Sequence, residues 1–425
     1  MSSSLPLYRT VWRWHFYAGI IVLPVLAWLA ITGALYLYHP EIERGLYRDW
    51  VELPTGLHTQ PLARTIRSVQ SQTGGRVTQV SIPAAATDSW RVAFTTGDGA
   101  ERMAFVRPDT GLVLGTAPAG GPMDLVKQLH SLSVAGPVAN VMIEIVAGWA
   151  IILVLTGFYL WWPRAGGKAL SLAGRVGERR FWRNFHASVG ALVGIIILFL
   201  AITGMPWTAF WGERFHSIVA ANKLGRPEGP TRPRNHDAHL PWSLQGSSSL
   251  RSSSAGDLGP DMALAAAARH GIGRPLVLDL PEERGEAYRV SRLVLRAEDA
   301  RVLHLGASDG QVIHEQRWAE FGMGAKAFEW GIYTHQGQQY GEVNRLIMLS
   351  GCLGVLLLTA SAPVLWWKRR RKGRLEPPPA SEAQQRGFLL LMLALGLLYP
   401  LTGLTMLLAL IGGSWRSRGG PLPQS

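Results

Sequence analysis

Five long apolar stretches alternate with polar segments along this chain, at residues 16–38, 138–162, 187–211, 343–367 and 388–411. Each is long enough to cross a hydrocarbon core of ~30 Å, which takes about 20 helical residues. Only 17% of the residues are charged, whereas about a quarter are charged in a typical soluble protein. The pattern predicts a polytopic α-helical membrane protein. The first stretch has spanning length and no small-residue cleavage site, so we expect it to remain as a helix.

The polar segments after the first and third stretches predict two small α+β modules. Each starts with a helical pattern and continues with β-type runs and an Asp-containing turn. These elements are 61–73, 76–82, 89–96, 102–107 and Pro108–Gly111 in the first segment, and 262–270, 275–280, 287–295, 301–305 and Ser308–Gly310 in the second. Residues 223–259 are rich in Pro, Gly, Ser and Arg, which predicts an extended loop.

The basic residues predict the orientation of the chain in the membrane. Short loops rich in Lys and Arg stay cytoplasmic, and such residues precede the first stretch, separate the second from the third, and follow the fourth. The N-terminus is therefore expected inside and both modules outside. Because the formal charge of +13 is concentrated in these loops, a nucleic-acid partner is not expected.

This orientation divides the chain into five spans and the segments between them. Spans 1 to 5 are predicted at residues 1–40, 138–164, 186–211, 343–368 and 388–411. The periplasmic modules are 41–137 and 212–342, the cytoplasmic loops are 165–185 and 369–387, and the periplasmic tail is 412–425.

The sequence is duplicated. His15 and His186 each stand 14 residues before the string LAITG, and His130 and His335 each stand 31 residues before a Trp-Trp pair. The two copies cover about 8–164 and 179–370. Since both copies begin on the same side, the prediction is a four-helix core built from two parallel repeats, with a fifth span outside the duplication.

These four histidines are the candidate metal ligands. A histidine within a membrane bundle is costly unless it has a partner, and two neutral imidazoles on facing helices can hold a haem. With Cys352 as the sole cysteine, Cys-ligated clusters and covalent CxxCH haem are excluded. Gly19 and Gly190 each follow a histidine by four residues and would leave room for a flat macrocycle. Alternatively, the histidines lie beside a packing seam or bind water in loops.

Other residues give weaker signals. His39 and His216 could serve as outer ligands but do not share a register, and Glu144 could serve function or helix contact equally. His236 and His239 are expected to be solvated. The residues without a paired pattern are His58, His270, His304 and His314, and the expected interfacial anchors are Trp161, Trp162, Trp366 and Trp367.

Several strings in the spans resemble those of the PepSY-associated transmembrane helix family, and the modules resemble PepSY domains. The strings are WRWH…LAITG, LHSL…LTGFYLWWPR and FHASVG, and the likeness covers about 8–370. The family includes inner-membrane ferric-siderophore reductases and other iron-regulated membrane proteins. The resemblance implies an inner-membrane location and b-type haems between the helices, here two, each with two histidine ligands.

The expected function is transmembrane electron transfer through haem b to an outer acceptor, a ferric siderophore, by a membrane oxidoreductase. No nicotinamide, flavin or P-loop motif is present, so electrons would come from a quinol or a separate cytoplasmic reductase. The alternative is a non-enzymatic protein that binds and regulates a periplasmic peptide or protein partner. A permease for iron chelates is less favoured, because the spans contain almost no charged residues.

Overall fold

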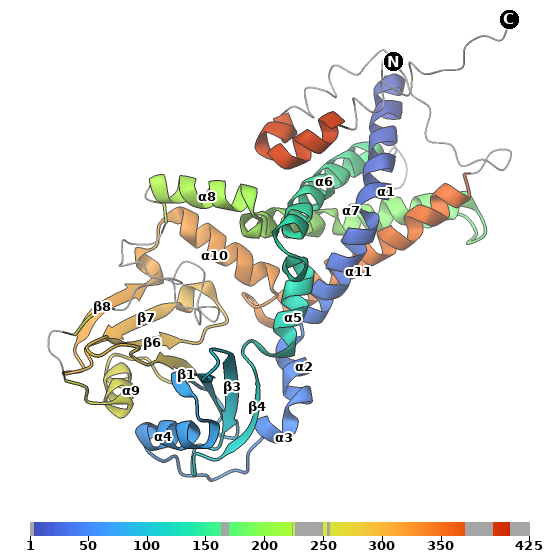
Figure 1. Cartoon of the computed structure of the whole chain (residues 1–425). Helices are drawn as coiled ribbons and strands as arrows, with labels where there is room; N and C mark the ends of the chain where they lie inside the picture. The colour runs from blue at the N-terminus through green and yellow to red at the C-terminus, as the bar shows by residue number, and fades with distance from the viewer. Residues whose placement is uncertain are drawn as a thin grey trace, which may run out of the picture.

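The computed structural model describes residues 4–162, 170–222, 224–225, 250–252, 256–369 and 394–408. A bundle of long helices stands on one side of a twisted sheet, and shorter helices connect the two parts (Figure 1). The HDAH residues His236 and His239, most of the predicted loop 223–259 and most of the predicted loop 369–387 lie outside the described residues.

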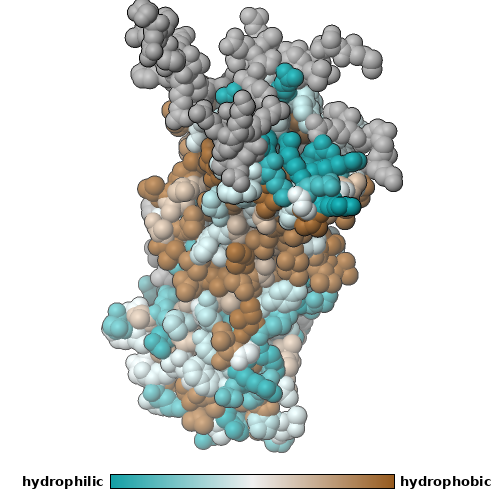
Figure 2. All heavy atoms as spheres, turned by 90° about the vertical axis from the view of Figure 1, so that its right-hand side faces the viewer, coloured by the Kyte–Doolittle hydropathy of each residue, from teal (hydrophilic) through white to brown (hydrophobic). Residues whose placement is uncertain are grey.

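Four helices in the described part are long and apolar enough to cross a membrane. They are α1 (Ser4–Tyr36), α6 (Pro137–Trp161), α7 (Arg179–Gly204) and α11 (Gly341–Trp367). Both α1 and α7 pack against α6 and against α11, which closes the four into a bundle. Large apolar side chains point outward, among them Ile21 and Ile195, which are 63% and 71% exposed. Figure 2 shows the resulting apolar band above the more polar surface of the sheet.

The third and fifth apolar stretches differ from their predicted outlines. Helix α7 begins at Arg179, before the apolar stretch, and ends at Gly204, before it finishes. In the fifth stretch, residues 394–398 and 400–408 are helical, and its two ends lie outside the described residues. This segment packs on α6, where Trp149 Nε1 donates to Thr405 Oγ1 at 3.0 Å. It is not among the four span-length helices of the described chain.

Short elements connect the bundle to the sheet. Two of them, α5 and α10, lead directly toward α6 and α11, and each ends in a candidate histidine, His130 or His335. The short helices are α2 (His39–Leu46), α3 (Arg48–Val51), α5 (Gly121–His130), α8 (Phe210–Ala221) and α10 (Met323–His335), with 3-10 turns at Ser133–Ala135, Met205–Trp207, Ala297–Asp299 and Trp318–Glu320.

The two predicted modules form one antiparallel sheet. Its strands are β1 (Arg76–Ile82), β2 (Trp90–Thr95), β3 (Glu101–Val106), β4 (Val113–Pro118), β5 (Leu276–Asp279), β6 (Tyr288–Arg292), β7 (Arg301–Leu305) and β8 (Val312–Arg317). The order is β4-β3-β2-β1-β5-β6-β7-β8, so the first strand of each module pairs with the other. The predicted turns precede β4 and β8, and Gly111 and Gly310 adopt φ of 72° and 68° there, a conformation that favours glycine.

Helices α4 (Leu62–Thr73) and α9 (Pro260–Arg269) cover the face of the sheet that is turned away from the bundle (Figure 1). Between them and the strands lies the largest apolar core, which includes Leu62, Leu278 and Leu303. Asp261 of α9 accepts hydrogen bonds from the backbone N–H groups of Leu62 and Ala63 at 2.6 and 3.0 Å. One module therefore caps a helix of the other, and the two share their core.

Candidate functional site

Each of the four candidate histidines is held through Nδ1 by a hydroxyl on a long helix of its own half. The pairs are His15 with Thr156 at 2.9 Å, His130 with Thr32 at 2.9 Å, His186 with Ser361 at 2.8 Å, and His335 with Thr203 at 2.8 Å. All four rings are partly buried. The same contact thus occurs twice in each half of the chain.

The hydrogen bonds of the hydroxyls favour one tautomer of every ring. A hydroxyl has one proton, and each of these hydroxyls donates it to a backbone carbonyl one turn earlier in its own helix. The acceptors are Ile152 O at 2.6 Å, Trp28 O at 2.8 Å, Leu358 O at 3.1 Å and Phe199 O at 2.7 Å, for Thr156, Thr32, Ser361 and Thr203 in turn. The hydroxyl oxygen must therefore accept from the imidazole. Nδ1 carries the ring proton, and Nε2 keeps the lone pair that a metal requires.

The four rings form two pairs at different heights in the bundle. The far pair, His15 and His186, lies on α1 and α7 toward the ends away from the sheet, and the two rings are near enough for a charge on one to affect the other. The sheet-side pair, His130 and His335, ends α5 and α10, and its two rings are near each other in the same sense. Each pair takes one histidine from each half of the chain.

Burial keeps the sheet-side pair neutral. It lowers the pKa of His130, and together with the nearby His130 ring it lowers the pKa of His335 to about 3. A buried imidazolium has lost its hydration, so the uncharged form is favoured. Neutral imidazole is the form that binds metal.

The paired rings suit a macrocyclic cofactor better than a metal ion alone. Within the part of the chain that the structure describes, no group of three or more His, Cys, Asp or Glu side chains could hold a metal ion. Two imidazoles leave most positions around an iron unfilled, and a porphyrin supplies four nitrogens for them. Two neutral imidazoles are a donor set that could hold the iron of a haem, with His15 and His186 as one such set and His130 and His335 as the other.

The comparison with known families agrees with the repeated motifs. The model of the family described as PepSY-associated TM region matches residues 12–369. The chain belongs to this family. A comparison with curated proteins gives no match. The match spans the four long helices and the whole sheet, so the chain is a PepSY-associated membrane protein.

Small residues beside the rings differ from those that the sequence singled out. In this PepSY-associated protein, a Cβ on Gly33, Gly157 or Gly204 would lie 3.4, 3.3 or 3.8 Å from Cε1 of His130, His15 or His335. A Cβ on Gly19 or Gly190 would instead meet Leu153 or Leu358, at 3.9 and 3.7 Å. Gly19 and Gly190 therefore lie at helix contacts, and their role beside a cofactor stays a prediction.

Sequence reasoning missed the hydroxyl partners. Thr32 and Thr203 are the fourth letters of the two LAITG strings, and Thr156 precedes a glycine in the same way. Ser361 precedes an alanine at the matching place in the second half. The available signal is a hydroxyl residue before a small residue in each of the four span-length helices, of which only the two LAITG strings served to mark the register.

The weaker candidates have other surroundings than the four paired rings. His39 donates through Nδ1 to the Tyr36 carbonyl at 2.9 Å, and the His216 ring meets Phe328 edge-on at 5.5 Å. His58 and His270 are exposed. Trp162 and Trp367 are 73% and 58% exposed near the ends of α6 and α11, as interfacial anchors would be.

Glu144 caps a helix. Its carboxylate is buried, and Oε2 accepts from the backbone N–H groups of Phe210 and Trp211 at 3.0 and 3.1 Å. These groups open α8, where a negative charge is favourable. Of the two alternatives that the sequence left open, the structure shows the helix contact, which is with α8.

His304 and His314, which show no paired pattern in the sequence, are neighbours in the sheet. They are directly opposite each other on β7 and β8, with ring centroids 5.9 Å apart. They continue a cross-strand row through Arg289 and Asp279, in which Arg289 Nε donates to Asp279 Oδ2 at 2.7 Å. The sequence spacing of the two histidines could not reveal this, because strand register alone brings them together.

Proposed function

We propose that this PepSY-associated membrane protein binds two b-type haems and passes electrons across a bacterial inner membrane. The far pair would hold one haem and the sheet-side pair the other. The sheet would lie in the periplasm, where the acceptor is a ferric siderophore. The observation that carries the proposal is the repeated Nδ1–hydroxyl contact, which leaves four Nε2 lone pairs on partly buried rings.

The orientation rests on the basic residues at the end of the bundle far from the sheet. Arg179 and Arg180 open α7, and Lys368 and Arg369 follow α11. Such residues favour the cytoplasmic side. The far pair would then lie toward the cytoplasm and the sheet-side pair toward the periplasm.

The residues of the chain hold and tune the sites. Haem iron supplies one-electron chemistry, and its potential depends on its axial ligands and on local polarity. Each hydroxyl orients one imidazole and fixes its tautomer, as partners of ligating histidines commonly do. An acceptor Fe(III) that gains one electron becomes Fe(II), a softer ion that oxygen-donor chelators release.

The optical spectrum of the purified full chain tests the proposal. We expect a Soret band, split α and β bands after dithionite addition, and a pyridine haemochrome count of two haems per chain. A preparation that remains colourless after haem supplementation would contradict the proposal and favour the regulatory alternative.

Single histidine substitutions assign the haems to the pairs. We expect His15→Ala or His186→Ala to remove one haem and His130→Ala or His335→Ala to remove the other, with the count falling from two to one in each. His39→Ala is the matched control, because within the described residues that ring bonds to Tyr36 in its own turn of chain and to no hydroxyl of another helix, and it should retain both haems. Counts that stay at two in all four variants would refute the assignment.

A further inference from the structure

Two arginines from different helices approach each other at the far end of the bundle. Arg179 opens α7, and Arg369 follows α11 and is partly buried. The two helix ends lie side by side (Figure 1), and Lys368 Nζ donates to the Gly177 carbonyl there at 2.6 Å. Burial, and after it the nearby charge of Arg179, lowers the pKa of Arg369. The fold therefore brings two like charges together in a place that is partly out of water.

Both arginines are next to the far pair of histidines. Arg179 precedes His186 by seven residues, so the two side chains belong to one face of α7, with about 10 Å of helix between them. The Arg369 guanidinium lies over the Phe16 ring, 4.9 Å from its centroid, and Phe16 directly follows His15. The two cations are thus on the side of the far pair that is turned away from the sheet.

A buried hydrogen-bond donor lies beside them. The Trp366 ring meets the same Phe16 ring edge-on, with centroids 5.9 Å apart. Its Nε1 is buried and has no hydrogen-bond partner among the described residues. A buried donor costs free energy until it finds an acceptor. Trp366 follows Ser361, the residue that orients His186, by five positions on α11, so this donor belongs to the surroundings of the far pair.

The helix ends around the far pair supply little negative charge. The described residues 4–15, 158–162, 170–186, 361–369 and 394–408 contain a single acid, Glu178. Neither Glu178 nor Arg179 forms an ion pair within the described chain. A ligand with more than one carboxylate would therefore meet two cations and an unused N–H group at this end.

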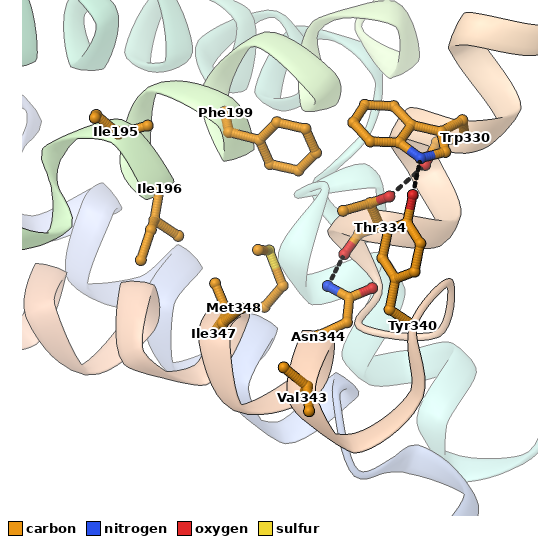
Figure 3. Close-up of a pocket in the computed structure, with 10 residues that line it drawn as sticks. All are labelled: Ile195, Ile196, Phe199, Trp330, Thr334, Tyr340, Val343, Asn344, Ile347 and Met348. Atoms are coloured by element: carbon orange, nitrogen blue, oxygen red, sulfur yellow. Dashed lines mark hydrogen bonds between the residues drawn. The ribbon is translucent and has the colours of Figure 1, made fainter.

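The surroundings of the sheet-side pair are different. Polar groups between α7, α10 and α11 bond to one another there, as Trp330 Nε1 does to the Tyr340 hydroxyl at 2.8 Å (Figure 3). Arg345, near the beginning of α11, forms ion pairs with Glu41 and Glu342. Its charge is already balanced by acids of the chain, whereas the charge of Arg179 is not.

We propose that Arg179 and Arg369 bind the two propionates of a haem held by His15 and His186, and that Trp366 Nε1 donates to one of them. The proposal rests on the proposed function, and it adds that the propionate edge of the far haem points away from the sheet. Both propionates extend from one edge of the macrocycle, and carboxylates form strong charge-assisted hydrogen bonds with arginine. Two negative charges would then lie beside the two guanidinium groups and offset their repulsion.

Haem dimethyl ester, in which both propionates are esterified and uncharged, tests the proposal. The full chain with His130→Ala, which is expected to retain the far haem alone, is depleted of haem and titrated with haem b or with the ester by Soret absorbance. We expect Arg179→Gln and Arg369→Gln each to lower the affinity for haem b about tenfold, as for the loss of one hydrogen bond to a charged group. Neither should lower the affinity for the ester, because it has no carboxylate to lose.

Two further variants sharpen this comparison. Trp366→Phe keeps an aromatic ring but removes the N–H group, and it should lower the affinity for haem b about fivefold while leaving the ester unaffected. Arg180→Gln is the matched control, because Arg180 is next to Arg179 but belongs to another face of α7 and is exposed. It should change neither affinity.

The same titrations separate this inference from the proposed function. A chain that binds no haem b contradicts the proposed function and the inference with it. If the chain binds haem b and the arginine variants weaken haem b and the ester alike, the arginines act through the fold, and the inference alone is overturned. Affinities that no variant changes would also overturn it. The unaltered arginines provide a test that needs no substitution at these positions, because the ester should bind at least about tenfold more weakly than haem b, and equal binding would contradict the inference.

Discussion

The bundle and the sheet each contain two matching halves, but what matches differs between them. In the bundle, the chemistry recurs: every candidate histidine has a counterpart, and every counterpart has a hydroxyl on Nδ1. In the sheet, the backbone recurs: strand order, pairing and the Gly111 and Gly310 turns match across the β1–β5 boundary, while the side chains facing the bundle do not.

One cross-strand row of residues shows how the side chains of the two halves of the sheet differ. Phe105 is opposite Arg91 and Gly115 in the first half, and His304 is opposite Arg289 and His314 at the matching places in the second. Trp50 packs on Phe105, with ring centroids 5.6 Å apart, and fills the space above Gly115. The first row is thus closed by aromatic packing, and the second is polar.

This contrast separates two kinds of constraint. A shared backbone with exchanged side chains is what a scaffold needs, since many residues can fill a pleated surface. A repeated histidine, hydroxyl and small residue at one register is what a cofactor site needs, because ligand orientation depends on each of them. The repeated positions in the bundle, and not the histidines of the sheet, therefore identify the candidate site.

Substitutions of the two matching arginines of the sheet should show the largest difference in their effect on protein stability. Arg289 and its partner Asp279 have side chains 3% and 4% exposed, and removing one member of a buried ion pair costs about 3–5 kcal/mol. Arg91 is 40% exposed and lies 3.8 Å from Glu43, a geometry worth under about 1 kcal/mol. We expect Arg289→Met to lower the unfolding temperature of the sheet strongly and Arg91→Met to change it little, as measured by circular dichroism. Equal shifts would show that the two rows are energetically alike.

Much of the fold could be predicted from local patterns. Six strands lie within a few residues of their predicted bounds, because alternation and turn glycines act within a short segment. The union of both modules in one sheet could not be predicted, since pairing of β1 with β5 joins residues about 200 positions apart. The early start of α7 also escaped prediction, because its first turns are polar.

The histidines of the candidate site could be predicted from the sequence, but their hydroxyl partners could not. Histidines in register were found because polar residues are rare in apolar helices and each had a counterpart. Thr32 and Thr203 were overlooked because a threonine within an apolar helix ordinarily satisfies its hydroxyl on its own backbone. It does so here too, and for that reason its oxygen remains an acceptor for the neighbouring ring.

Removing one hydroxyl should test whether the hydroxyl on Nδ1 holds the ligating histidine in its orientation. Thr203→Val preserves the shape of the side chain but leaves the His335 Nδ1–H without its acceptor, at a cost of about 1–3 kcal/mol. We expect haem affinity at the sheet-side pair to fall about 10- to 100-fold, measured by transfer of haem to an apo-globin acceptor.

Thr203→Ser retains the hydroxyl and is the matched control for this substitution. It should hold haem nearly as tightly as the unaltered protein, because the oxygen that accepts from His335 is still present. The far pair should release its haem at the same rate in both variants, since its hydroxyls are Thr156 and Ser361. If valine and serine behave alike, the hydroxyl does not orient the ring.

The smallest effects are expected at the glycines that follow the hydroxyl residues. Ala362 already occupies this place in α11, so one extra methyl is compatible with the site. A Cβ on Gly204 would lie 3.8 Å from His335 Cε1, an ordinary contact, whereas a Cβ on Gly157 would lie 3.3 Å from His15 Cε1. Gly204→Ala should therefore preserve both haems and stabilise α7 by up to about 1 kcal/mol through helix propensity.

Gly157→Ala should gain less stability, because the His15 ring must shift by a few tenths of an ångström. The same shift should move the α band of the far haem in the reduced spectrum. An unchanged α band in Gly157→Ala together with a shifted α band in Gly204→Ala would contradict this prediction. The closer contact with a histidine would then be the one at Gly204.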